Sequence, residues 1–118
     1  MSRLTGIAGI VLAALMLSQC GGPSAGPPAR AAVTHRVTID GSTFTPASLT
    51  VHAGDSVVWI NADPFPHTAT SMDRSAAGHF DSKEIAPQQS WSYTPTVKGD
   101  FPYLCTLHQT MKGTLRVE

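Results

Sequence analysis

The chain has 118 residues, eight basic and eight acidic side chains, and no net formal charge. This length allows one small domain, and the balanced charge without a Lys/Arg run gives no support for nucleic-acid binding. Glycine and proline are scattered between short apolar runs, which favours an all-β fold.

The N-terminal segment has the features of an export signal. Arg3 supplies a positive start, and residues 4–17 form an uncharged, largely apolar stretch. This stretch is shorter than the roughly 20 residues that a spanning helix needs, and it suits a signal peptide. Residues 1–19 are therefore predicted to be a signal peptide, and the protein is expected in the periplasm or cell envelope.

Cys20 follows Leu17-Ser18-Gln19. This sequence resembles the bacterial lipobox, in which the cysteine becomes the lipidated first residue of the mature protein, although Gln19 is larger than the usual residue there. The resemblance implies that Cys20 anchors the protein to a membrane. Ordinary signal cleavage within residues 21–32 is the alternative. A disulfide between Cys20 and Cys105, the only two cysteines, is a further one.

Residues 20–32 are predicted to be a flexible tether, because Gly, Pro, Ala and Ser dominate them and no bulky apolar residue can join a core. Residues 33–118 are predicted to fold as one domain. Apolar and polar residues alternate over 34–40 and again around Leu49 and Val51, which indicates half-buried strands.

Further strands are predicted over residues 56–60, 68–71, 90–94, 101–105 and 113–117. Residues 72–78 read as a loop, with room for one helical turn. Pro95 ends one strand, and Pro102 removes a backbone donor inside another. Seven or eight short strands separated by turns predict a Greek-key β-sandwich.

Cys105, His108 and Met111 fall within one short loop near the C-terminus, and His67 lies in an upstream loop. A thiolate, two imidazoles and a weak thioether form the ligand set of an electron-transfer copper site, because this mixture can hold both Cu(I) and Cu(II). The other histidines, His35, His52 and His79, are expected to have no metal role.

Residues 33–118 resemble a cupredoxin of the plastocyanin and amicyanin group. The similarity is carried by residues 44–51, 53–59, 61–67, 99–105 and 105–113, and the C-x-x-H-x-x-M spacing resembles the short ligand loop of amicyanin. The resemblance implies one type 1 copper ion, with His67, Cys105 and His108 as strong ligands and Met111 as the long axial ligand. Thr68 stands where many relatives have an asparagine that contacts the cysteine sulfur.

The resemblance implies a one-electron carrier that docks redox proteins at an apolar face around His108. Copper binding, buffering or delivery without redox turnover is the alternative, since the same ligands hold Cu(I) well. An enzyme is not expected. Copper oxidases and nitrite reductases need a second copper centre with further histidines, and no oxyanion or substrate elements accompany the Cys105–His108 pair.

Overall fold

The computed structural model describes residue 6 and residues 30–118. The predicted signal peptide, the lipidation site at Cys20 and most of the predicted tether lie outside the described residues. Among the described residues, no helix is long and apolar enough to cross a membrane.

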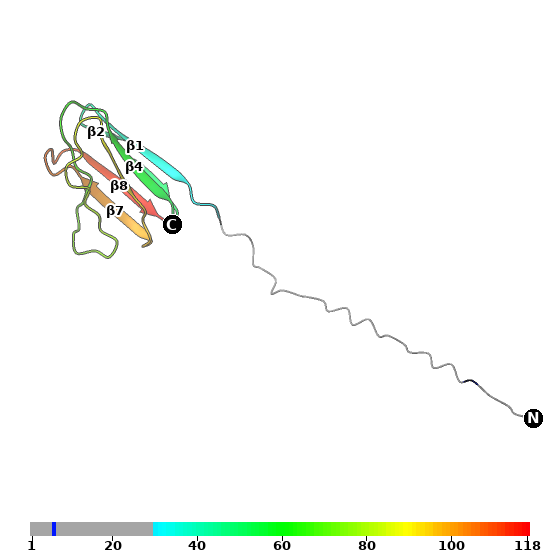
Figure 1. The fold of residues 1–118 in the computed structure, drawn as a ribbon. Helices are drawn as coiled ribbons and strands as arrows, with labels where there is room; N and C mark the ends of the chain where they lie inside the picture. Colours follow the sequence, from blue (N-terminus) through cyan, green and yellow to red (C-terminus); the bar gives the residue numbers. More distant parts are fainter. Residues whose placement is uncertain (1–5, 7–29) are drawn as a thin grey trace, which may run out of the picture.

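Eight strands form two four-stranded sheets, which confirms the predicted all-β sandwich (Figure 1). The first sheet has the order β2-β1-β4-β6 and the second the order β3-β8-β7-β5. The strands are β1 (Thr34–Asp40), β2 (Thr43–Thr45), β3 (Ser48–Val51), β4 (Ser56–Asn61), β5 (Thr70–Ser71), β6 (Ser90–Tyr93), β7 (Gly99–Leu104) and β8 (Lys112–Val117).

Both sheets mix parallel and antiparallel pairs. β1 pairs with β4 in parallel, and β3 pairs with β8 in parallel, whereas the other neighbours are antiparallel. The central strands are β1 and β4 in the first sheet and β8 and β7 in the second. The ends of β4 and β7 and the start of β8 meet at one pole of the sandwich, as the loops around them show in Figure 1.

The alternation seen in the sequence places one face of each sheet in a shared core. In β4 the inward positions are Val57, Trp59 and Asn61, and in β7 they are Phe101 and Tyr103. Aromatic rings fill the centre: the ring centroids of Trp59 and Tyr103 lie 5.7 Å apart in an edge-to-face arrangement. Such burial supplies most of the stability of a small sandwich.

The structure corrects two of the elements that were predicted from the sequence. The strand expected over residues 68–71 covers only Thr70–Ser71, because the backbone of Thr68 turns toward Cys105 instead of pairing. Residues 72–78 contain turns and bends without a helical turn. Pro102 lies inside β7 as predicted. Its carbonyl accepts from the Met72 N–H, just beyond the end of β5. Because the N and C=O of one strand residue point to the same side, the N–H that proline lacks would also lie beyond β5, and no bond between paired strands is lost.

A buried carboxylate organises the pole where β1 and β4 begin. One Asp55 oxygen accepts from Arg30 (2.8 Å) and from the Val33 N–H (3.0 Å). The other lies 2.9 Å from His35 Nε2 and also accepts from the His52 N–H and from Arg30. Asp55 is fully buried, so these bonds replace the water that its charge loses. The carboxylate thereby fixes the start of β4, the strand that leads to His67.

The arrangement around Asp55 predicts an acid-sensitive contribution to stability. Arg30 first, then the Val33 N–H and His35, hold the pKa of Asp55 far below its usual range although burial opposes them. A lowered pKa stabilises the fold above the unfolded-state pKa of about 3.9, and this contribution is lost as the pH falls through the folded-state pKa. We expect Asp55→Asn to lower the melting temperature at pH 7 by roughly 5 °C or more.

Melting curves of both proteins between pH 7 and pH 2 test this expectation, and the difference should narrow below about pH 4. Asp40→Asn is the matched control, because Asp40 is exposed and its side chain makes no hydrogen bond within the described residues. Equal melting temperatures for the wild type and Asp55→Asn at pH 7 would contradict the assigned role.

Candidate metal centre

The loop after β4 is held by the last residue of that strand. Asn61 is fully buried, and its Nδ2 donates to the carbonyls of Phe65 (2.7 Å) and Ile85 (2.9 Å). Its Oδ1 accepts from the Asp63 N–H at 3.0 Å. The amide therefore satisfies backbone groups of a tight loop that would otherwise be buried without partners.

His67 is fixed at both its backbone and its ring. Its backbone pairs with Ile85 in an isolated antiparallel bridge, and its side chain is fully buried. Nε2 lies 2.8 Å from Asp63 Oδ2, while Nδ1 lies 3.7 Å from Cys105 Sγ. An ionised carboxylate only accepts, so Nε2 is the donor to Asp63, and Nδ1 is the ring nitrogen on the cysteine side.

Asp63 connects this loop to the β1–β2 turn. Its two carboxylate oxygens accept from the N–H groups of Ser42 (2.8 Å) and Gly41 (2.7 Å). Both turn residues have positive φ, 59° at Gly41 and 55° at Ser42, as a two-residue hairpin turn of this hand requires. The Ser42 N–H lowers the pKa of Asp63 most, and Gly41 and His67 add to this against the opposing effect of burial. A charged Asp63 therefore orients the His67 ring.

The loop between β7 and β8 presents the other predicted ligands. The Cys105 N–H donates to the Met111 carbonyl (3.1 Å), and the Met111 N–H donates to the His108 carbonyl (2.9 Å). These bonds close the loop on itself, so its residues share one compact turn. Cys105 carries a free thiol and is fully buried; the Met111 side chain is 3% exposed, and His108 is exposed.

His67, Cys105 and His108 come together in a single group. Their ligand atoms all lie within 4.8 Å of one another, and the two imidazole centroids are 5.3 Å apart. One thiolate with two imidazole nitrogens matches the equatorial set of a type 1 copper site. Two of the three residues are buried and one reaches the surface, so the group can exclude solvent and still offer one edge to a partner.

Thr68 takes over the contacts expected of an asparagine. Its backbone N–H donates to Cys105 Sγ (3.3 Å), and its Oγ1 accepts from the Thr106 N–H (2.9 Å). The two hydroxyl oxygens of Thr68 and Thr106 lie 3.2 Å apart. The departure from the usual residue therefore keeps the hydrogen bond to sulfur and links the two ligand loops.

The remaining histidines lie elsewhere. His35 and His52 contact Asp55 at the opposite pole, and the exposed His79 has Nδ1 3.0 Å from the Ala76 carbonyl. Asn61 and Asp63 were missed from the sequence. One signal could have found Asp63: a metal-binding histidine usually donates its second ring N–H to a carboxylate, and Asp63 lies four residues before His67.

Comparison with known proteins agrees with this geometry. A family described as the cupredoxin-like domain matches residues 7–117. Plastocyanin from Scenedesmus fuscus is 34% identical over 85 residues, which cover 64% of this chain and 86% of that protein. Amicyanin from Paracoccus versutus is 29% identical over 84 residues, which cover 70% of this chain and 63% of that protein.

Solved structures show the same fold. A Cu(I) structure of an amicyanin variant has a TM-score of 0.66 and 28% identity, covering 72% of this chain and 82% of the amicyanin chain. A Cu-containing nitrite reductase from Thermus scotoductus SA-01 has a TM-score of 0.68 and 26% identity, again over 72% of this chain. The match spans only 22% of the reductase chain, so most of that enzyme has no counterpart in the alignment.

Proposed function

Since this chain belongs to the cupredoxin-like family, we propose that it binds one type 1 copper ion and carries single electrons between redox proteins. The observation that carries the proposal is the convergence of the ligand atoms of His67, Cys105 and His108 within 4.8 Å. The plastocyanin and amicyanin relatives support it, because they are 34% and 29% identical to this chain over 85 and 84 residues.

The chemistry of the donor set suits a copper ion. His67 would bind through Nδ1, because Asp63 occupies Nε2, and Cys105 would bind as a thiolate. Met111 is proposed as the weak axial ligand; its side chain is buried and its backbone closes the same loop. When bound, copper supplies a one-electron couple between Cu(I) and Cu(II).

The protein contributes rigidity and shielding. Hydrogen bonds fix the His67 loop through Asn61 and Asp63, and the Cys105–Met111 loop closes on itself. Ligands that cannot rearrange keep nearly one geometry in both oxidation states. We propose electron transfer rather than copper delivery because delivery requires a ligand set that opens, whereas His67 and Cys105 are both fully buried.

The ligand assignment predicts a blue protein. Adding Cu(II) to the purified protein should give intense visible thiolate-to-copper absorption, and Cys105→Ser should abolish it because a hydroxyl cannot form the soft covalent bond. Met111→Leu should keep the colour and raise the reduction potential, since only the weak sulfur donor is lost. Cys20→Ser is the matched control and should stay blue. A pale wild-type product would rule out the type 1 site.

Electron transfer is proposed to occur through an apolar face around the exposed His108. Phe65 and Leu107 are 59% and 45% exposed, although both are large apolar residues. Pro64 is also exposed in the neighbouring loop. A small apolar face favours brief encounters, because transfer needs contact and turnover needs rapid release.

A charge placed on this face should slow transfer without changing the copper site. We expect Leu107→Glu to slow electron self-exchange between copies of the protein at least about tenfold, because two like charges would meet in the encounter. Line broadening in NMR spectra of mixed oxidation states measures the rate. Val97→Glu adds the same charge to an exposed apolar residue before β7, at the other pole. Equal rates for the two variants would exclude this face.

Export and anchoring are further parts of the proposal. Residues 1–19 would be removed as a signal peptide, and Cys20 would carry the lipid that holds the protein at a membrane in the cell envelope. Residues 21–32 would then allow the copper domain to reach its partners.

The intact mass of the protein isolated from its native membranes tests the anchor. We expect a chain that begins at Cys20 with added acyl mass, and we expect Cys20→Ala to block this processing. A mature chain that begins after Cys20 without acyl mass would refute the anchor and leave the export proposal standing.

A further inference from the structure

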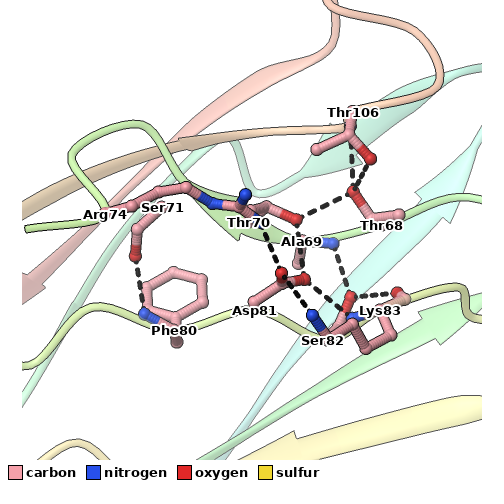
Figure 2. A network of polar contacts seen from close by, with 10 residues as sticks. All are labelled: Thr68, Ala69, Thr70, Ser71, Arg74, Phe80, Asp81, Ser82, Lys83 and Thr106. Atoms are coloured by element: carbon pink, nitrogen blue, oxygen red, sulfur yellow. Dashed lines mark hydrogen bonds and ion pairs between the residues drawn. The ribbon is translucent and has the colours of Figure 1, made fainter.

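We propose that the Thr70 hydroxyl, anchored by Asp81, is a positioning group that holds Thr68 and thereby sets the hydrogen bond to the Cys105 sulfur. The inference rests on the proposed copper site and adds a second layer of residues to it. Figure 2 shows the threonines and Asp81 in one connected network beside the ligand loops.

The two ligand loops are linked to each other through Thr68. Thr68 directly follows His67, and Thr106 directly follows Cys105. The Thr106 N–H donates to Thr68 Oγ1, while the Thr68 N–H donates to Cys105 Sγ. Each loop therefore supplies one backbone donor to a side chain of the other, and both bonds depend on the position of Thr68.

Thr68 is itself held by the hydroxyl of Thr70. Thr70 Oγ1 lies 3.0 Å from Thr68 Oγ1 and 3.2 Å from Asp81 Oδ1. Thr68 and Thr70 are 3% and 2% exposed, so water has little access to these hydroxyls. In such surroundings a lost hydroxyl leaves its partner unsatisfied, and the partner moves or loses stability.

Asp81 is held in place by both its backbone and its carboxylate. Asp81 bridges to Thr70 through the backbone, and the flanking Ser82 N–H donates to the Ala69 carbonyl. Its Oδ1 also accepts from the Lys83 N–H (2.9 Å), and its Oδ2 pairs with Arg74 (2.6 Å) and with Lys83 Nζ (3.2 Å). Thr70, Lys83 and Arg74 thus hold the carboxylate, and Thr70 connects it to Thr68 in the ligand loop (Figure 2).

The network has a consequence for the reduction potential. A hydrogen bond donated to the thiolate stabilises its negative charge and weakens its donation to Cu(II), which favours the reduced state. If Thr70 holds Thr68 in place, then loss of the Thr70 hydroxyl loosens this bond and favours the oxidised state. The potential should therefore fall, and the blue absorption should move to longer wavelength.

Thr70→Val tests the role of the hydroxyl, because valine keeps the shape of threonine and removes its hydrogen bonds. We expect a lower reduction potential and a red-shifted blue band, whereas Thr70→Ser should restore the wild-type values. Thr114→Val is the matched control: Thr114 is a half-buried strand residue whose side chain makes no hydrogen bond within the described residues. Equal shifts for Thr70→Val and Thr114→Val would overturn the proposal.

Asp81→Ala provides a second variant on a half-buried residue that the fold should tolerate. Removing a negative charge raises the potential, whereas loss of the anchor lowers it, so comparison with a variant that loses only a charge separates the two effects. Asp73→Ala is the control, because Asp73 is an exposed carboxylate in the same region whose side chain accepts from Ser75 and makes no hydrogen bond to the ligand loops within the described residues. A potential that falls, or that rises less than in Asp73→Ala, supports the anchor, and a rise at least as large as that of Asp73→Ala overturns it.

Hydrogen exchange in the metal-free protein separates this inference from the copper assignment. We expect the Thr106 and Thr68 amides to exchange several-fold faster in Thr70→Val than in the wild type, with the core amides of β4 unchanged. Unchanged exchange at both amides would refute the positioning role even in a blue protein. Faster exchange in a chain that never turns blue would instead refute the copper site and leave the positioning contact intact.

Discussion

The hydrogen bond from the Thr68 backbone to the Cys105 sulfur lies where the chain passes from the first sheet to the second. His67 and Thr68 lie between β4, which belongs to the first sheet, and β5, which belongs to the second sheet and pairs with β7, the strand before Cys105. The pairing of β5 with β7 brings Thr68 beside Cys105, and the bonds of Asn61 and Asp63 to the same segment place His67. The strand pairing and the polar bonds at the pole therefore serve the same end: they hold the two ligand loops at a fixed separation, although Thr68 and Cys105 are 37 residues apart in sequence.

Hydrogen bonds at the two ends of β4 act on the site in different ways. At the start of the strand, Asp55 binds groups from the segment before β1 and from the β3–β4 turn, and so fixes where β4 begins. At its end, Asn61 and Asp63 hold the loop and aim the His67 ring. A buried strand with both ends fixed transmits little displacement, because packed interiors resist deformation. The geometry at His67 is thus set by contacts along the whole length of the strand.

Local sequence was sufficient for the features that depend on spacing. Alternating apolar and polar residues predicted β1 and β3, an apolar and β-branched run predicted β4, and the short Cys105–Met111 spacing predicted that one loop would carry three candidate ligands. The parallel pairing of β1 with β4 and of β3 with β8 was not predictable, because alternation reports which face is buried and not which strand is the neighbour. The short β5 was overestimated for a similar reason, since the bond from Thr68 to Cys105 is a long-range contact.

The polar residues around the site were the hardest to foresee. Thr70 and Asp81 have ordinary sequence surroundings, and their roles appear only when residues 80–83 are placed beside the ligand loops. The spacing of Asp63 to His67 was a signal in the sequence, but its bonds to the β1–β2 turn were not predictable. A composition-based reading treats such residues as solvated loop positions. In the folded protein they become hydrogen-bond partners of buried groups, and sequence patterns do not show which groups these are.

The two carboxylates that hold the ligand loops are both compensated by nearby positive or hydrogen-bond-donating groups. Asp63 is neutralised in effect by the Ser42 and Gly41 N–H groups and by the His67 ring, and it is 5% exposed. Asp81 is paired with Arg74 and Lys83, which carry the opposite charge at the surface. Neither carboxylate therefore carries an unpaired charge near the ligand loops. The docking face proposed around His108 would then select partners by contact and shape, which agrees with the zero net charge of the chain.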